Sequence, residues 1–109
     1  MIEKVVVPAA GLGTRLLPIT KELPKEMLPI FTVGKNGGVC LKPMLQAVFE
    51  QLFDVGFREF YFIVGRGKRA IADHFASDNG FLRILRRDGK DDLAKELEDL
   101  YERVSVSSV

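Results

Sequence analysis

Apolar residues change their spacing along the chain, and each spacing predicts a different element. The run Val5 to Val7 is continuous and β-branched, which is typical of a strand covered on both faces in a parallel sheet. Between residues 43 and 56 the apolar positions recur at helical spacing, with Pro43 suited to the first turn and Gly56 suited to the stop. We therefore expect a buried strand and, after a long excursion, a mostly buried helix.

The next patterns extend this order. Residues 59–65 (EFYFIVG) are again aromatic and β-branched and predict a second strand, and residues 65–76 turn and enter a helix. The order strand, excursion, helix, strand, helix is typical of a βαβ unit, whose crossover is right-handed in nearly all proteins. The sequence therefore predicts the α/β class with a parallel sheet.

Three segments lie outside this unit. Residues 30–42 place an Asn-Gly-Gly turn between two short apolar runs, which predicts a hairpin. Residues 81–103 predict two amphipathic helices broken at Asp88-Gly89, and residues 104–109 (VSVSSV) alternate like the beginning of a third strand. Because a parallel sheet normally has several strands with both faces covered, we interpret residues 1–109 as the N-terminal part of a longer domain.

An irregular stretch, PAAGLGTRLLPITKELPKEMLP at residues 8–29, separates the first strand from the hairpin. It carries too much apolar surface for a disordered segment, and long irregular stretches in compact domains are usually functional. Its prolines fix the backbone φ angle and make the segment stiff. Lys21 and Lys25 bring positive charge, and stiffness lowers the entropic cost of holding Lys25 in place, as a catalytic cation requires.

The start of this loop has the composition of an anion site. Gly11 and Gly13 allow backbone N–H groups to converge on a ligand without a Cβ in the way. Thr14 adds a hydroxyl donor, and Arg15 adds a fork of donors that suits two phosphate oxygens. The pattern does not match the Walker A motif. It does not match the Rossmann fingerprint either, because the third glycine of that fingerprint is replaced by Leu16. A plain turn with solvated cations is the alternative at this point.

Composition excludes several classes of protein. The chain has 109 residues, 47% hydrophobic and 28% charged, with a formal net charge of +1, and therefore lacks the basic bias of a dedicated nucleic-acid binder. No apolar run approaches the ~20 residues of a membrane-spanning helix, and the N-terminus lacks the layout of a signal peptide. Cys40 is the only cysteine, so that no internal disulfide forms and the cytoplasm is the expected location. We expect its thiol to pack rather than react.

The loop residues AAGLGTRLLPITKELPKEMLP resemble the signature of the UTP–glucose-1-phosphate uridylyltransferases, a family within the sugar nucleotidyltransferase superfamily. The resemblance continues through KPMLQAVFEQLFDVGFREFYFIVGRGKRAIADHF and covers residues 3–75. The pairing of TK with PKEMLP favours the uridylyl branch over the thymidylyl branch. Residues 32–41 (TVGKNGGVCL) are longer than the bacterial segment and similar to the archaeal one, and we assign them no role.

The resemblance implies a Rossmann-like, three-layer α/β sandwich, of which residues 1–109 form the N-terminal, nucleotide-binding part. It also implies a set of nucleotide-binding positions: Ala9, Ala10, Gly11, Gly13, Thr14, Arg15, Lys25 and Glu26. Of these, residues 9–11 line the ribose and base through their backbone, and residues 13–15 hold the phosphates. Lys25 neutralises charge near the α-phosphorus, and Glu26 lies near the base. Arg15 and Lys25 are the implied catalytic residues.

The implied reaction is attack of a glucose-1-phosphate oxygen on the α-phosphorus of UTP, which gives UDP-glucose and expels pyrophosphate with the help of Mg²⁺. Two unit charges roughly 4 Å apart gain about 4 kcal/mol at an effective dielectric constant of about 20. Two cationic side chains are therefore not enough to neutralise a triphosphate, and a divalent metal must share this task. In the family, the aspartate that holds this metal and the residues that read uracil follow in later sequence. The resemblance thus implies no metal ligand in this chain, and we expect the chain alone to be inactive.

Alternatives stay open at this point. The chain can belong to another sugar-1-phosphate nucleotidyltransferase, which uses dTTP or a different sugar, or it can be a non-catalytic fragment for nucleotide binding or assembly. UTP and glucose-1-phosphate are the expected partners, without nucleic acid or membrane. The charged helix 91–103 is either a solvated face or a homo-oligomer contact, and GRGKRA at 65–70 is a tight turn or a second phosphate contact. We interpret His74, Asp73 and Asp78 as structural residues.

Overall fold

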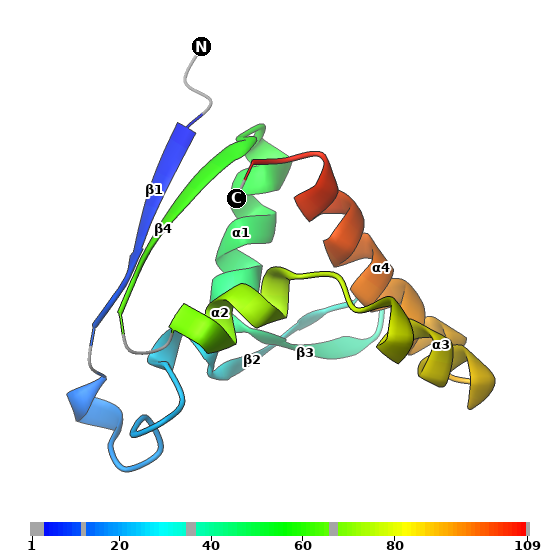
Figure 1. Ribbon diagram of the computed structural model, residues 1–109, viewed down its shortest axis with the longest axis horizontal. Helices are drawn as coiled ribbons and strands as arrows, with labels where there is room; N and C mark the ends of the chain where they lie inside the picture. The colour runs from blue at the N-terminus through cyan, green and yellow to red at the C-terminus, as the bar shows by residue number, and fades with distance from the viewer. Residues whose placement is uncertain (1–3, 12, 35–36, 66–67, 109) are drawn as a thin grey trace.

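The computed structural model describes residues 4–11, 13–34, 37–65 and 68–108. Its central sheet pairs β1 (Lys4–Ala9) in parallel with β4 (Glu59–Val64), from Lys4 opposite Glu59 to Ala9 opposite Val64 (Figure 1). Both predicted strands are thereby confirmed. The loop, a hairpin and one long helix lie between them in the chain, so that the two strands belong to the expected strand–helix–strand unit.

Helix α1 (Met44–Val55) packs beside this sheet and begins and ends where the sequence predicts. Pro43 precedes the first turn, where a missing N–H costs nothing. Gly56 follows the last turn with a φ angle of 124°, a conformation that side chains with a Cβ rarely adopt. Its N–H bonds the carbonyl oxygens of Leu52 and Phe53, which closes the end of the helix.

An aromatic core joins α1 to the sheet and to α2 (Lys68–Phe75). Phe49 of α1 is fully buried, and its ring centroid lies 4.7 Å from that of Phe60 and 5.5 Å from that of Phe75. Phe62 stacks on Phe75 with a centroid distance of 5.4 Å. Each such pair contributes about 0.5–1.5 kcal/mol beyond the area that it buries. The rings therefore fix both helices against the sheet.

The predicted hairpin is confirmed. Strands β2 (Pro29–Val33) and β3 (Val39–Pro43) are antiparallel, and Asn36 of the connecting turn lies outside the described residues. The hairpin is joined to α1 by an ion pair in which Lys42 Nζ lies 2.8 Å from Glu50 Oε1. Both side chains are mostly buried, so that this pair fixes the hairpin on the helix.

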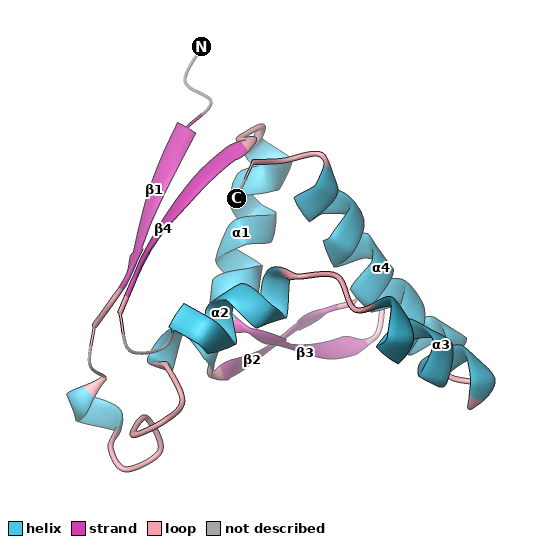
Figure 2. Ribbon diagram, viewed as in Figure 1, coloured by secondary structure: helices cyan, strands magenta, loops and turns pink. Residues whose placement is uncertain are grey.

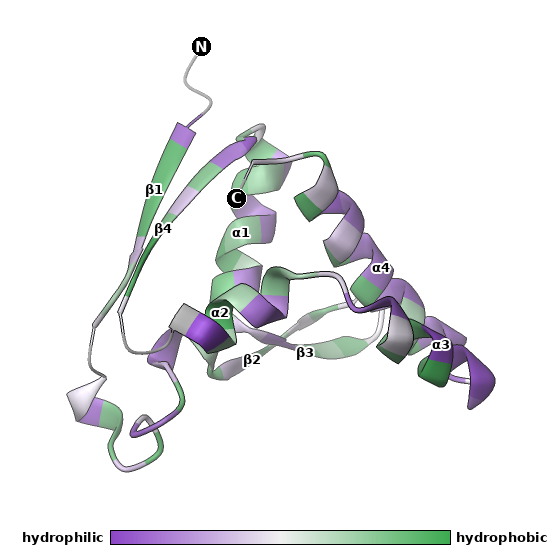
Figure 3. Ribbon diagram, viewed as in Figure 1, coloured by the Kyte–Doolittle hydropathy of each residue, from purple (hydrophilic) through white to green (hydrophobic). Residues whose placement is uncertain are grey.

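Helices α3 (Asn79–Arg87) and α4 (Asp91–Ser105) are the two predicted amphipathic helices, and Gly89 separates them with a φ angle of 75°. Figure 3 shows the alternation of hydrophilic and hydrophobic residues along both. Asp78 caps α3, because its Oδ1 accepts a hydrogen bond from the Phe81 N–H at 3.0 Å. No helix in the described ranges is long and apolar enough to cross a lipid bilayer.

The predicted strand at residues 104–109 is wrong in its position. Helix α4 continues through Ser105. The Ser105 hydroxyl donates to the Glu102 carbonyl oxygen at 2.6 Å, and the Ser107 hydroxyl donates to the Arg103 carbonyl oxygen at 2.8 Å, so that both serines bond to the last turn of the helix. Ser108 then forms an isolated parallel bridge with Glu59 of β4. The alternating sequence therefore reaches the sheet four residues later than its pattern predicts.

In the described part of the chain, helices cover one face of the β1–β4 sheet (Figure 2). On the other face, Val6, Tyr61 and Ile63 are 59%, 51% and 54% exposed. The α/β class with a parallel sheet is thus confirmed, and the described residues supply two of the three layers that the resemblance implies.

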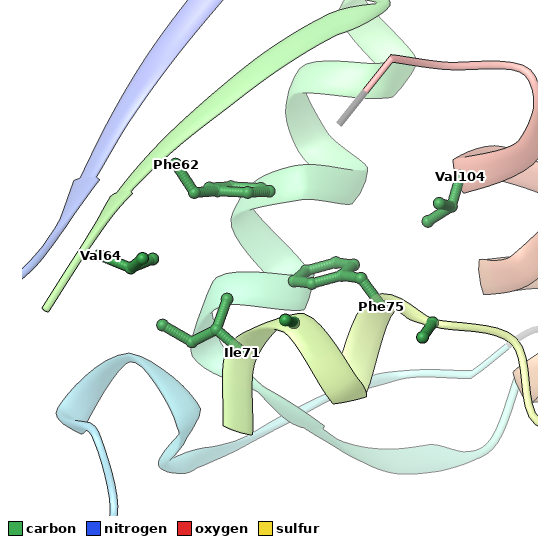
Figure 4. A pocket seen from close by; sticks show the side chains of 7 residues that line it. Phe62, Val64, Ile71, Phe75 and Val104 are labelled. Atoms are coloured by element: carbon green, nitrogen blue, oxygen red, sulfur yellow. The ribbon is translucent and has the colours of Figure 1, made fainter. Parts of the chain in front are cut away.

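An apolar hollow of about 430 Å³ lies on the covered face, between β4, α2 and α4. Figure 4 shows the rings of Phe62 and Phe75 facing each other in it, with Val64, Ile71 and Val104 around them. We call it the β4 hollow.

Candidate functional site

The glycine-rich part of the loop forms a turn that leads from the sheet into a short helix. After β1 ends at Ala9, Gly13 adopts the left-handed conformation, with a φ angle of 66°, and precedes the 3₁₀ helix η1 (Thr14–Leu16). The N–H of Leu16 donates to the Gly13 carbonyl oxygen at 3.0 Å. The first N–H groups of a helix have no partner inside it, so that the amides around Thr14 are available to an anion.

The second limb of the loop brings a lysine back to this turn. Lys25 opens the 3₁₀ helix η2 (Lys25–Met27), which follows Pro24. A Cβ placed on Gly11 would stand 3.1 Å from Lys25 Nζ, which is tighter than ordinary contact. Glycine at position 11 therefore leaves the space that the ammonium group occupies.

Both limbs line one hollow of about 520 Å³, which we call the loop hollow. Its lining residues are Gly13, Thr14, Arg15, Leu16 and Lys25. Thr14, Arg15 and Lys25 are exposed, as a site that binds an external ligand requires. Arg15 and Lys25 form no ion pair with another described residue, so that an incoming anion does not have to displace a carboxylate.

Other predicted residues of the loop lie apart from this lining. Lys21 is exposed, and its Nζ lies 2.9 Å from Glu22 Oε1. Ala9 is buried at the end of β1, and the exposed Ala10 lies against the chain that leaves β4, because a Cβ on Gly65 would stand 3.2 Å from its carbonyl oxygen. The proposed second phosphate contact in GRGKRA depends on residues 66–67, which lie outside the described residues.

Glu26 is buried although it follows the exposed Lys25. It is 5% exposed, and neither carboxylate oxygen has a hydrogen-bond partner among the described residues. A buried carboxylate without donors is costly, which sets Glu26 apart from an ordinary packing residue. It does not line the loop hollow together with the two cations.

Thr20, which the sequence analysis did not single out, contacts Gly13 of the loop hollow. It is 7% exposed in a loop whose apolar residues, such as Ile19 at 59%, are largely solvent-exposed. Its Oγ1 donates a hydrogen bond to the Gly13 carbonyl oxygen at 2.7 Å. The only signal in the sequence was its place in the TK pair of the family signature.

His74, Cys40 and Asp73 form contacts within the fold. His74 Nε2 lies 2.7 Å from Gln46 Oε1, and burial lowers the pKa of the His74 imidazole while the charge of Glu50 partly opposes this shift. The thiol of Cys40 is half-buried in β3, and Asp73 lies 3.7 Å from Arg69 on the surface of α2. Within the described ranges, no three His, Cys, Asp or Glu residues are grouped as metal ligands.

Comparisons with known proteins agree with the resemblance seen in the sequence. A UTP–glucose-1-phosphate uridylyltransferase of Staphylococcus haemolyticus is 41% identical over 97 residues, which cover 89% of this chain and 31% of that protein. A second relative, UTP–glucose-1-phosphate uridylyltransferase 1 of Staphylococcus saprophyticus, is also 41% identical over 97 residues, with 89% and 31% covered. The chain therefore spans about a third of the length of these curated relatives.

Solved structures show the same relationship. A UTP-bound UGPase from Acinetobacter baumannii superposes with a TM-score of 0.76 at 34% identity, over 100% of this chain and 35% of that one. An apo UDP-glucose pyrophosphorylase superposes with a TM-score of 0.79 at 35% identity, over 100% and 37%. The family model described as nucleotidyl transferase matches residues 4–95. Because this match includes most of the sequence and the fold agrees, the chain belongs to the nucleotidyl transferase family.

Proposed function

We propose that this chain forms the triphosphate-binding part of a UTP–glucose-1-phosphate uridylyltransferase. The complete enzyme would transfer the uridylyl group of UTP to glucose-1-phosphate and release UDP-glucose and pyrophosphate. One observation carries the proposal: Arg15 and Lys25, ten residues apart in the chain, line the same hollow beside glycine backbone. The relatives support the choice of UTP, since their names include uridylyltransferase and one structure is described as UTP-bound.

The loop hollow supplies the groups that phosphoryl transfer needs, which are mainly positioning and neutralisation of charge. Gly13 lets the phosphates approach the backbone, and Thr14 adds its amide and hydroxyl as donors. The Arg15 guanidinium can bind two phosphate oxygens at once. We assign Lys25 to the α-phosphate, where its ammonium group offsets charge that develops as pyrophosphate leaves.

The nucleoside end of UTP would lie along residues 9–11 and contact their backbone. Gly65 supports this path, because its close approach to the Ala10 carbonyl oxygen holds this part of the loop against the end of β4. We assign Glu26 to the base: its unpaired carboxylate oxygens are acceptors, and the N–H of a uracil ring is a donor that would satisfy one of them.

The resemblance implies magnesium for the complete enzyme. The described His, Cys, Asp and Glu residues do not group as metal ligands. We therefore assign no step of the reaction to a metal held by these residues. The proposal predicts that the chain alone produces no pyrophosphate from UTP and glucose-1-phosphate, and a coupled pyrophosphate assay measures this.

The proposal also includes a cytoplasmic location, in keeping with the single free thiol of Cys40, and no nucleic-acid or membrane partner. The exposed charged face of α4 is the candidate surface for a homo-oligomer contact. Another base or sugar is the competing hypothesis, and competition of dTTP and CTP against UTP for the complete enzyme distinguishes base preference.

A titration of the chain with UTP tests the proposal. Replacement of Arg15 or Lys25 by Ala should weaken UTP binding roughly tenfold to a hundredfold, since hydrogen bonds to charged groups contribute about 1.5–3 kcal/mol. Lys21→Ala is the matched control, because Lys21 belongs to the same loop and is exposed but pairs with Glu22 outside the lining. Equal losses in all three variants would contradict the proposed site.

A further inference from the structure

Thr20 departs from the rule that apolar side chains are buried and polar ones exposed. Leu16, Leu17 and Ile19 precede it and are 45%, 53% and 59% exposed, whereas Thr20 is 7% exposed. Buried hydroxyl groups are nearly always hydrogen-bonded, and this one donates to the Gly13 carbonyl oxygen at 2.7 Å, across seven positions of chain. The burial of Thr20 therefore serves a contact with the phosphate-binding turn rather than the hydrophobic core.

The same side chain also packs against Gly13. A Cβ placed on Gly13 would stand 3.1 Å from Thr20 Cβ and 3.2 Å from both Cγ2 and Oγ1. The contact thus holds Gly13 from two directions, because the hydroxyl binds its carbonyl oxygen while the carbon atoms close the space beside its Cα. The Leu16 N–H binds the same carbonyl oxygen at 3.0 Å, so that both acceptor positions of this oxygen are used.

This contact decides which way the next amide points. The Gly13 carbonyl and the Thr14 N–H belong to one planar trans peptide and point in opposite directions. Thr20 lies outside the lining of the loop hollow, whereas Thr14 lies in it. A carbonyl held toward the Thr20 hydroxyl therefore leaves the Thr14 N–H for the other side of the peptide, where an anion can accept its hydrogen bond.

Without the hydroxyl, the Leu16 N–H is the one donor among the described residues that is left on the Gly13 carbonyl oxygen, and the packing beside the Gly13 Cα is weaker. Glycine adopts both signs of φ at similar cost, so that the Gly13–Thr14 unit can rotate. A rotated unit would present the carbonyl oxygen, which carries partial negative charge, to the phosphates. We propose that Thr20 is a positioning residue of the triphosphate site, which holds the Gly13–Thr14 peptide with its N–H available to the ligand. This inference rests on the proposed function for the identity of the ligand.

Three variants of the full chain test it. Thr20→Val keeps the shape of the side chain and removes the donor, and Thr20→Ser keeps the donor. Thr32→Val, in the half-buried threonine of β2, is the control for a lost hydroxyl outside the loop. With UTP and with inorganic pyrophosphate as probes, Thr20→Val should raise the dissociation constant roughly twofold to tenfold, the equivalent of one net hydrogen bond. Thr20→Ser should restore most of the affinity, and Thr32→Val should leave it unchanged.

A second measurement needs no ligand. In NMR spectra of the free protein, the Gly13 carbonyl ¹³C and Thr14 amide ¹⁵N shifts should move in Thr20→Val and stay close to the original values in Thr20→Ser. The positioning role would be overturned if these shifts did not change in Thr20→Val. It would also be overturned if the wild type bound UTP and Thr20→Val bound it with the same affinity. Moved shifts in a protein whose wild type binds neither probe would support the positioning role and contradict the proposed function instead.

Discussion

The loop hollow and the β4 hollow have similar volumes and opposite linings. The loop hollow, about 520 Å³, is lined by the exposed side chains of Thr14, Arg15 and Lys25, together with Gly13 and Leu16, in a loop with two short 3₁₀ helices. The β4 hollow, about 430 Å³, is lined by aromatic and aliphatic side chains from a strand and two helices. The first suits an anion that brings charge and acceptors, while the second suits apolar surface that gains by leaving water.

The two hollows also differ in what their residues do for the fold. Phe62 and Phe75 of the β4 hollow belong to the aromatic core or pack against it, so that their contacts stabilise the folded state. Arg15 and Lys25 of the loop hollow touch no oppositely charged described residue and are exposed. The proposed function therefore assigns binding and stability to different residues, and substitutions should separate them.

The largest expected effect is on stability. Phe75→Ala removes a ring that is 6% exposed and should lower the free energy of unfolding by about 3–5 kcal/mol. Lys25→Ala should change it by less than about 0.5 kcal/mol, because the side chain is exposed. Urea denaturation of both variants measures the difference, and similar losses would show that the loop hollow is part of the core.

A backbone substitution should affect both properties. Gly13→Ala places a Cβ on a residue with a φ angle of 66° and should cost about 1–2 kcal/mol of stability. Gly37→Ala is the matched control, since its φ angle is 85° and a Cβ there meets nothing within 4 Å. Only Gly13→Ala should also weaken UTP binding, as measured by calorimetric titration, because only its Cβ presses on Thr20.

Salt should distinguish the two linings with a smaller effect. Raising the sodium chloride concentration from about 0.05 M to about 0.5 M shortens the Debye length and should weaken UTP binding several-fold. Fluorescence of a hydrophobic dye such as ANS, bound at the β4 hollow, should not weaken in the same series. Ala72→Arg changes a lining residue and should abolish the dye fluorescence, whereas Ala70→Arg on the same helix should not. This result would confirm that the dye binds at the β4 hollow.

The smallest expected effect is a pH dependence of stability near the β4 hollow. Burial lowers the pKa of His74 below its ordinary 6.5, so that the folded protein resists the proton that the unfolded chain accepts. The contribution of neutral His74 to the free energy of unfolding should therefore be fully present above pH 6.5 and should decrease as the pH falls below this value. Thermal unfolding from pH 7.5 to 5 measures this slope, and His74→Gln should reduce it. An unchanged slope in that variant would assign the effect to other groups.

Local chemistry predicted most elements of the fold. Pro43 and Gly56 define the ends of α1, and Gly89 separates the last two helices, because each residue restricts or extends the backbone by itself. The prediction of a strand at residues 104–109 was wrong in position, because alternating apolar and polar residues occur both in strands and at the ends of helices. In the structure the helix continues through Ser105, and the hydroxyls of Ser105 and Ser107 bond carbonyl oxygens of its last turn.

The site was predictable only in part. The types of residue in the loop indicated an anion site, and the structure brings Arg15 and Lys25 together as expected. Spacing alone did not show that Glu26, next to exposed Lys25, is buried, since this depends on how η2 sits on α1. Nor did it show the contact of Thr20 with Gly13, because a seven-residue separation in irregular backbone has no fixed geometry.

An NMR titration of the full chain with UTP tests the central claim most directly, because it monitors both hollows at once. The account predicts that the amides of Gly11, Gly13, Thr14 and Lys25 shift in proportion to bound UTP. The amides of Ala72 and Ala76, which line the β4 hollow, should stay in place. Shifts confined to the β4 hollow, or none at the loop at saturating UTP, would contradict the account.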